Sequence, residues 1–283
     1  MSKTHHSDYD EATTARCERA LVTLLGDIGP WNQRVYLAGG LAPRYIVGSL
    51  PEGARPHVGT TDVDLVIGLA VGDENPEAYR TLENNLRKAD FHDETSFRWK
   101  RAVDDVTVIV EFLCETDKVE PGRIYKPKEG TGSGLGAFNV RGAQLVTRDY
   151  FERVIEAERL DDGGRSQVTV RVADILSYCV LKVFAFQDRH ENKDPYDLVY
   201  CLLNFGEDTE EAGRHAAQSA ISADPVVQEA LQMLAARFES ADHDGPRAYA
   251  AFLDDGDAEQ AARLRQEAVA VTRQFLSAFH AQE

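Results

Sequence analysis

The sequence predicts an α/β N-terminal half with a mixed sheet, followed by an α-helical C-terminal half. Short apolar and β-branched runs bounded by turn residues, which are typical of strands, are confined to about residues 30–172. From about residue 173 onward, apolar residues recur at helical spacing instead. We therefore expect two domains, an α/β core over residues 9–172 and a helical domain over residues 173–283.

The α/β half begins with a helix and continues with strands separated by turns. Leu21 and Leu25 belong to an apolar helical face that predicts the first helix over residues 9–27. A glycine pair ends the strand in "RVYLAGG", and Pro43 suits the first turn of a short helix in "LAPRYIVGSL". We next expect an internal strand in "VDLVIGL" and a helix in "PEAYRTLENNLRKAD". The segment "SFRWKRAVDDVTVIVEFLCE" predicts two strands joined by a turn at Asp104–Asp105. A loop over residues 117–143 and further strands up to residue 172, with a turn at Asp161–Gly164, complete this half.

Composition limits the class of protein. The 31 basic and 48 acidic residues give a formal net charge of -17, which opposes nonspecific binding to nucleic acid or anionic membranes but allows a local basic patch. The four cysteines are dispersed without CxxC spacing, so neither a zinc site nor a disulfide framework is indicated. We expect no signal peptide in the polar N-terminus, and no apolar run approaches the roughly 18 residues of a membrane span. We expect a cytoplasmic protein with no membrane partner.

Two aspartates open the strand in "TTDVDLVIG". Residues i and i+2 of a strand point to the same face, so Asp62 and Asp64 project together. Two carboxylates this close repel each other, and a divalent cation such as Mg²⁺ or Mn²⁺ between them would remove the repulsion. An exposed strand end, with the pair in solvent, is the alternative.

Two features around this strand bear on the metal hypothesis. Gly39 and Gly40 lie between a strand and a helix start, where glycine lets the backbone approach an anionic ligand; a tight turn explains them equally well. Glu111 lies inside the apolar strand "TVIVEFLCE", where a buried carboxylate needs a partner. That partner is either a metal shared with the aspartates or an arginine on the neighbouring strand, Arg98 or Arg101.

The order "AGGLAPRYIVG", "TTDVDLVIG" and "IVEFL" resembles the nucleotidyltransferase fold of the polymerase-beta type. The resemblance implies that Asp62, Asp64 and Glu111 hold divalent ions, which align a nucleoside triphosphate for attack by an acceptor hydroxyl. It also implies that Gly39 and Gly40 bind the nucleotide. Leu41 departs from the pattern, because the family usually has Ser or Thr there.

A second group of polar residues lies in "LKVFAFQDRHENKDPYDL". Lys182 and Arg189 are seven residues apart and share a helix face. Asp194 precedes Pro195, and Asp197 follows three residues later. Helix chemistry alone accounts for this pattern, with Asp194 as N-cap, Pro195 as first helical residue and Asp197 favourable in the first turn.

The spacing K-x(6)-R-x(3)-K-D-x-x-D-L is also similar to the C-terminal signature of AbiEii-type nucleotidyltransferases, which include the MenT toxins. The resemblance covers about residues 35–205. It implies that Lys182 contacts the triphosphate, that Arg189 and Asp194 help to form the nucleotide site, and that Asp197 takes a catalytic role. Residues 207–283 match no pattern and are expected to form a helical cap.

The resemblance implies an enzyme that transfers NMP from an NTP to a hydroxyl and releases pyrophosphate. The acceptor would be an RNA or tRNA 3′ end, and the protein would be the toxin of a toxin-antitoxin pair with a cognate antitoxin. A small-molecule or protein acceptor, and a non-catalytic nucleotide-binding member of the fold, remain the alternatives. An RNA patch could form from "FRWKR" and "KVEPGRIYKPK", with Trp99 or Tyr125 stacking on bases; a solvated hairpin face explains these segments equally well.

Overall fold

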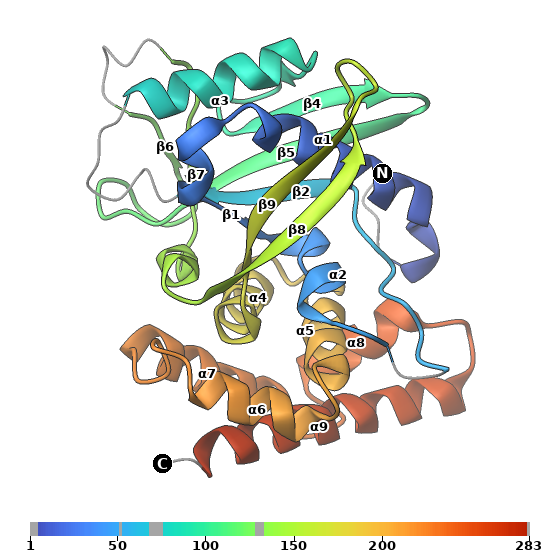
Figure 1. Ribbon diagram of the computed structural model, residues 1–283. Helices are drawn as coiled ribbons and strands as arrows, with labels where there is room; N and C mark the ends of the chain where they lie inside the picture. The colour runs from blue at the N-terminus through green and yellow to red at the C-terminus, as the bar shows by residue number, and fades with distance from the viewer. Residues whose placement is uncertain (1–4, 51–52, 68–75, 128–132, 282–283) are drawn as a thin grey trace. The chain divides into compact units, whose positions relative to one another are not determined.

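The computed structural model describes residues 5–50, 53–67, 76–127 and 133–281. The chain divides into two compact units, which are described separately (Figure 1). The sheet unit comprises Asp10–Ala42 and Gly59–Ala173, and the helical unit comprises Met1–Tyr9, Pro43–Val58 and Asp174–Glu283. The helical unit thus resumes beside the expected boundary at residue 173, but it also includes residues 43–58, which the sequence analysis assigned to the α/β core.

The sheet unit is built on a mixed sheet, as expected from the sequence. Its helices and strands are α1 (Glu11–Gly26), β1 (Val35–Ala38), β2 (Asp62–Ile67), α3 (Pro76–Lys88), β3 (His92–Asp93), β4 (Arg98–Val103), β5 (Val106–Cys114), β6 (Ile124–Tyr125), β7 (Ala137–Asn139), β8 (Tyr150–Glu158) and β9 (Arg165–Ala173). The strand order is β3-β4-β5-β2-β1-β9-β8, with β7 also pairing with β5 and β6 with β7. β2 is parallel to β5 and antiparallel to β1, while β1 is parallel to β9. The expected loop over residues 117–143 was partly wrong, because β6 and β7 form within it.

Helices α1 and α3 cover one face of this sheet (Figure 1). Val63, Leu65 and Phe112 point to that face and are fully buried. On α3, the Asn85 side chain donates a hydrogen bond to the carbonyl of Leu24 in α1, and the guanidinium of Arg87 lies over the ring of Trp99 in β4. Because side chains alternate along a strand, the intervening residues of β2, β4 and β5 occupy the opposite face.

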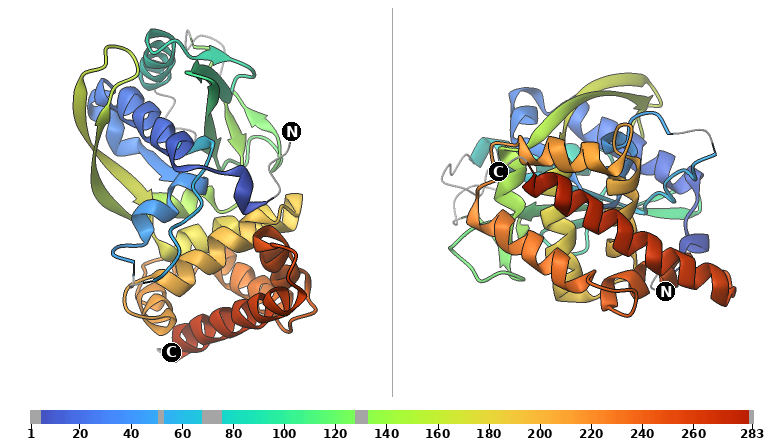
Figure 2. Two further views of the ribbon diagram at one scale, coloured as in Figure 1. Left: turned by 90° about the vertical axis from the view of Figure 1, so that its right-hand side faces the viewer. Right: turned by 90° about the horizontal axis from the view of Figure 1, so that it is seen from below.

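The helical unit consists of helices of very different lengths, four of which have an aspartate cap at the N-terminus. They are α2 (Pro43–Ile46), α4 (Ile175–Arg189), α5 (Lys193–Asn204), α6 (Thr209–Ala217), α7 (Pro225–Arg237), α8 (Asp244–Leu253) and α9 (Ala258–His280). Aspartates at the N-caps of α4, α6, α7 and α9 accept backbone N–H groups, which explains why these helices start where they do. The long helix α9 packs along α6 and α8 (Figure 2). In the described part of the chain, no helix is both long and apolar enough to cross a bilayer.

Candidate functional site

Three carboxylates occupy the sheet face opposite α1 and α3. Asp62 and Asp64 alternate in β2 with the buried Val63 and Leu65, so they share the other face. In the parallel pairing of β2 with β5, Asp64 is the partner of Glu111. Paired residues of neighbouring strands lie on the same face, so strand register brings Glu111 beside the two aspartates.

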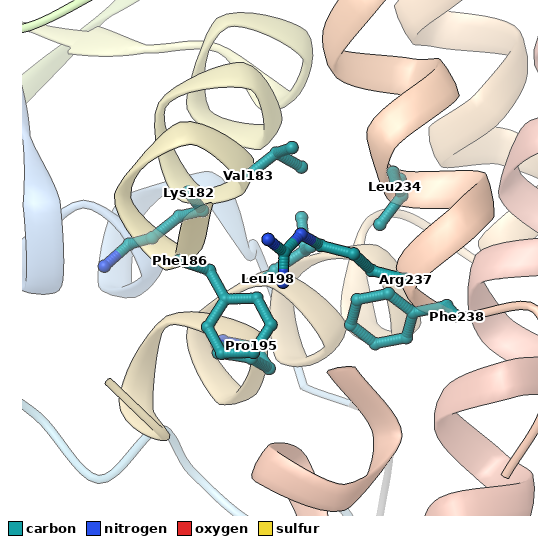
Figure 3. A pocket seen from close by; sticks show the side chains of 8 residues that line it. All are labelled: Lys182, Val183, Phe186, Pro195, Leu198, Leu234, Arg237 and Phe238. Carbon is teal, nitrogen blue, oxygen red and sulfur yellow. The ribbon is translucent and has the colours of Figure 1, made fainter. Parts of the chain in front are cut away.

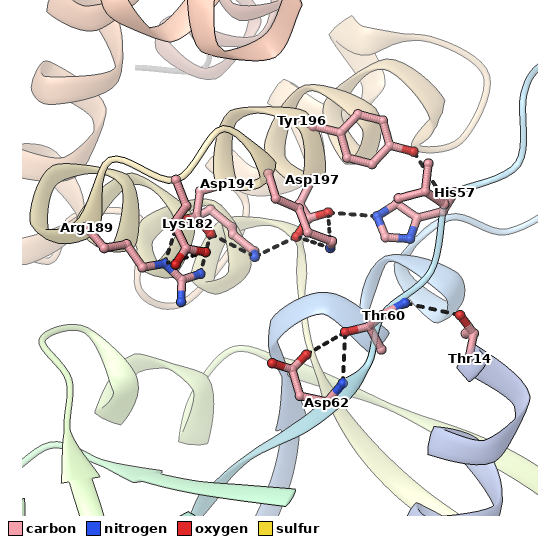
Figure 4. A network of polar contacts seen from close by, with 12 residues as sticks. Thr14, His57, Thr60, Asp62, Lys182, Arg189, Asp194, Tyr196 and Asp197 are labelled. Carbon is pink, nitrogen blue, oxygen red and sulfur yellow. Dashed lines mark hydrogen bonds and ion pairs between the residues drawn. The ribbon is translucent and has the colours of Figure 1, made fainter. Parts of the chain in front are cut away.

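The start of β2 is fixed by a short chain of hydrogen bonds (Figure 4). The Thr60 hydroxyl donates to Oδ1 of Asp62 at 2.6 Å, and the Thr60 N–H donates to the Thr14 hydroxyl in α1 at 3.1 Å. Asp62 remains half-buried rather than enclosed in the core. The two threonines therefore hold the Asp62 carboxylate in place at the end of the strand.

The glycine pair packs against the second aspartate. Gly39 follows β1, whose last residue, Ala38, pairs with Asp64. Gly39 has a φ of +65°, and a Cβ at this position would lie 1.7 Å from Oδ2 of Asp64. Glycine is thus needed both for the backbone conformation and to make room for the carboxylate. Leu41, two residues after Gly39, is fully buried, so its side chain belongs to the core. Nucleotidyltransferases of the polymerase-beta type, which the sequence resembles, usually have Ser or Thr at this position.

Glu111 forms an ion pair with Arg98, the alternative that the sequence left open. The two residues are direct partners across β4 and β5, and Nε of Arg98 donates to Oε1 of Glu111. Burial alone would lower the pKa of Arg98, but Glu111, with smaller contributions from Glu94 and Asp62, raises that pKa above its usual value. Arg98 is therefore a permanent cation beside the carboxylates.

The donor set suits a hard divalent cation. Carboxylate oxygens are the ligands that Mg²⁺ prefers, and one or two of them commonly suffice when substrate phosphates complete the shell. Asp62 and Asp64 provide such a pair, and Glu111 is the third oxygen donor on this face. Within the described residues, no three Asp, Glu, His or Cys side chains are already grouped closely enough to hold a metal. The three-ligand site expected from the sequence stays a prediction.

A second polar group lies in the helical unit, where α4 faces α5 (Figure 4). Nζ of Lys182 lies 3.1 Å from Oδ1 of Asp194 and 2.6 Å from Oδ2 of Asp197. All three side chains are buried, the two aspartates completely. Asp194 is not an N-cap, as helix chemistry suggested, because α5 starts one residue earlier at Lys193. Its carboxylate turns toward α4 instead.

Three further side chains complete what we call the buried ion network, defined as His57, Lys182, Arg189, Lys193, Asp194 and Asp197. Arg189 donates from Nε and Nη2 to the Asp194 carboxylate at 2.8 and 2.7 Å. Lys193 donates to Asp197 at 2.7 Å, and Nε2 of His57 lies 2.8 Å from Oδ1 of Asp197. His57 was missed by the sequence analysis, because it lies in a loop 140 residues from its partner.

Burial and pairing set the charges in this network. Burial lowers the pKa of His57 to about 4 despite the nearby Asp197, so the imidazole is neutral at pH 7 and donates its Nε2 proton. Burial would raise the pKa of Asp197, but Lys182 and Lys193 hold it well below its usual value. Burial would lower the pKa of Lys182, but Asp197 and Asp194 raise it. Lys182 and the two aspartates are thus charged.

The structure brings together the residues of the AbiEii-like signature within one unit. Lys182 and Arg189, expected to contact nucleotide, are each bound to Asp194. Arg189 remains half-exposed, whereas Lys182 is enclosed by its two aspartate partners. Because Asp62 and Asp64 belong to the other unit, a common site for the two groups stays a prediction.

The suggested stacking residues do not lie at the surface. Trp99 is 1% exposed and Tyr125 is 7% exposed, so the expectation that either ring stacks on RNA bases was wrong. Trp99 alternates in β4 with Arg98 and Lys100 and therefore points to the face that α3 covers. Lys100 binds Glu94 at 3.2 Å, which reduces the positive charge of this hairpin.

Three cavities in the described part of the helical unit bear on the expected nucleotide site, and of the candidate nucleotide-binding residues they contain only Lys182. Figure 3 shows a small cavity between α4, α5 and α7, lined by Lys182 and by mostly apolar side chains. Its volume of about 10 Å³ is near the minimum for a single water molecule. Two open grooves along α9 share Arg273 and Ser277 and contain none of the residues singled out from the sequence.

No protein-family model matches the chain, and a search of curated proteins finds no match.

Proposed function

We propose that the protein is a metal-dependent nucleotidyltransferase that transfers NMP from an NTP to a hydroxyl acceptor and releases pyrophosphate. One observation carries the proposal: Asp62, Asp64 and Glu111 share one sheet face, with Gly39 packed against the Asp64 carboxylate. Carboxylates on one sheet face beside a glycine turn suit the binding of a metal–triphosphate complex.

Each residue in this group has a distinct task. Asp62 and Asp64 would hold Mg²⁺ or Mn²⁺, which supplies charge neutralisation and alignment of the triphosphate. Thr60 keeps the Asp62 carboxylate oriented through its 2.6 Å hydrogen bond. Gly39 leaves room for the Asp64 carboxylate, because a Cβ at this position would lie 1.7 Å from Oδ2 of Asp64.

The resemblance to AbiEii-type enzymes points to an RNA or tRNA 3′ end as acceptor and to a toxin role with a cognate antitoxin. In this proposal Lys182, Arg189, Asp194 and Asp197 support the nucleotide site. Since Lys182 is already held by two aspartates, its first task would be to order Asp194 and Asp197. Arg189, half-exposed, is the member of the network best able to reach a phosphate.

The test is transfer of label from each α-labelled NTP to total RNA in the presence of Mg²⁺. Asp62→Asn and Asp64→Asn should each reduce transfer by about a thousandfold or more, because loss of a metal ligand costs several kcal/mol of transition-state stabilisation. Asp104→Asn is the matched control, since Asp104 is an exposed carboxylate of the same unit that pairs with Arg16. It should transfer at the wild-type rate.

The possible outcomes distinguish a wrong prediction of the acceptor from a wrong prediction of the reaction. Pyrophosphate release without labelled RNA would show the right reaction on another acceptor, a small molecule or a protein. Absence of any NTP turnover, or full activity in Asp64→Asn, would overturn the proposal.

A non-catalytic nucleotide-binding protein is the second candidate. Two features favour this alternative. Arg98 already binds Glu111, the third carboxylate of the proposed metal site. Leu41 is buried and provides no hydroxyl for a phosphate. Saturable NTP binding with no turnover at any acceptor would support this alternative.

A further inference from the structure

We propose that Arg98 is a built-in competitor of the metal: it holds Glu111 while the site is metal-free and weakens divalent-cation binding until it is displaced. The inference rests on the proposed function, because it concerns the same three carboxylates. It assigns a role to a residue that the family resemblance does not include.

Strand register makes this competition local. Arg98 in β4 is the direct partner of Glu111 in β5, and Glu111 is in turn the partner of Asp64 in β2. The three residues therefore form one row across three adjacent strands, all on the face away from α1 and α3. Nε of Arg98 donates to Oε1 of Glu111, one of the two oxygens available to a metal.

Charge gives the direction of the effect. Asp62, Asp64 and Glu111 carry three negative charges, and Arg98 brings this group of four to -2. Nε of Arg98 donates to Glu111 and its Nη1 lies 3.9 Å from Glu94, so the guanidinium interacts with more than one carboxylate. A divalent cation must compete with it for Glu111 and is repelled by it at Asp62.

Arg98 is placed to move when the metal arrives. Its side chain is 41% exposed, whereas that of Glu111 is 13% exposed. Glu94, between β3 and β4, offers a second carboxylate at 3.9 Å from Arg98. Release from Glu111 thus leaves the guanidinium with another partner and with solvent, and frees it to meet phosphate oxygens.

Mn²⁺ binding, followed by the loss of the free-ion signal in electron paramagnetic resonance without nucleotide, tests the inference. Arg98→Gln should bind Mn²⁺ about tenfold more tightly than wild type, and Arg98→Lys, which keeps the cation, should bind with nearly wild-type affinity. Lys100→Gln is the matched control, because Lys100 is a cation of the same strand and face that pairs with Glu94 rather than Glu111. Its affinity should change much less.

A double-mutant cycle locates the effect at Glu111. In a Glu111→Gln background, most of the gain from Arg98→Gln should disappear, since the competition is for that carboxylate. Asp64→Asn should abolish the binding in every background. Equal Mn²⁺ affinities in wild type and Arg98→Gln, with Asp64-dependent binding in both, would overturn the role of Arg98 alone. Failure of both proteins to bind Mn²⁺ would overturn the metal site and the proposed function together.

Discussion

The buried ion network of the helical unit and the carboxylates of β2 and β5 in the sheet unit differ in how their charges are paired. In the helical unit, Lys182, Lys193 and Arg189 surround two fully buried aspartates, and every oxygen of those aspartates accepts a hydrogen bond from a cationic or imidazole group. In the sheet unit, three carboxylates share one face with Arg98, which donates to Glu111. The first group is closed by its own members, whereas we propose that the second binds a divalent cation.

In our proposal, the buried ion network stabilises the fold, whereas the carboxylates of the sheet bind a ligand. A buried pair contributes little net stability relative to apolar residues, but losing one member leaves an uncompensated charge and is costly. A carboxylate at a partly exposed sheet face can be removed at small cost to folding, because water solvates what remains. The two groups should therefore respond oppositely to mutation, the network in stability and the carboxylates in ligand binding.

The largest expected effect on stability is from Asp197→Ala. This change removes a partner from Lys182, Lys193 and His57 together, within a fully buried site. We expect a loss of about 3–5 kcal/mol in the free energy of unfolding, measured by urea denaturation. Asp188→Ala, at an exposed position of α4, is the matched control and should change the free energy by less than about 0.5 kcal/mol. Similar small changes in both variants would show that the network is not closed as described.

A second, smaller effect depends on pH. The folded state holds the pKa of His57 at about 4, below its usual value of 6.5, mainly through burial and against the pull of Asp197; Lys193 and Lys182 lower it further. Between these two pH values the unfolded chain binds a proton that the folded chain does not, so stability falls as the pH falls. The lowered pKa values of Asp194 and Asp197 make contributions that are lost only near and below pH 3.8.

Comparison of wild type with His57→Gln isolates this contribution. From pH 7 to pH 5 the wild type should lose about 2 kcal/mol more of its unfolding free energy than the variant, because the variant lacks the titrating group. The other histidines are present in both proteins and cancel in the difference. If the unfolding free energy of His57→Gln falls as steeply as that of wild type, a group other than His57 causes the pH dependence.

Local patterns predicted most of the sheet unit. The two-residue turn at Asp104–Asp105 determines the pairing of the hairpin, and the resulting register puts Arg98 opposite Glu111. The same alternation puts Trp99 on the face of Val103 and Val110, so the burial of Trp99 could have been predicted from the pattern. In contrast, β6 and β7 have two and three residues, too few to show any periodicity.

Contacts between residues far apart in the chain could not be predicted from local sequence patterns. His57 meets Asp197 across 140 residues, and no short pattern links a loop histidine to a helix aspartate. Asp194 had a good local explanation as an N-cap before proline, but the cation on α4 determined its orientation. The glycine pair was recognised as a turn, yet its reason, the space taken by the Asp64 carboxylate, depends on strand pairing. The missing information is tertiary contact in each case.

The smallest expected effect is the thermal stability of Asp62→Asn without metal or nucleotide. The amide oxygen still accepts the hydroxyl of Thr60, so the hydrogen bond at the start of β2 is kept. Loss of one negative charge relieves repulsion with Asp64 but also removes an attraction to Arg98. These terms oppose each other, and we expect a change within about 0.5 kcal/mol. The wild type should gain thermal stability when Mn²⁺ and NTP are added, and the variant should lose that gain. An unfolding temperature several degrees lower in the variant, with the ligand-induced shift retained, would make the Asp62–Asp64 pair structural and remove the contrast between the two units.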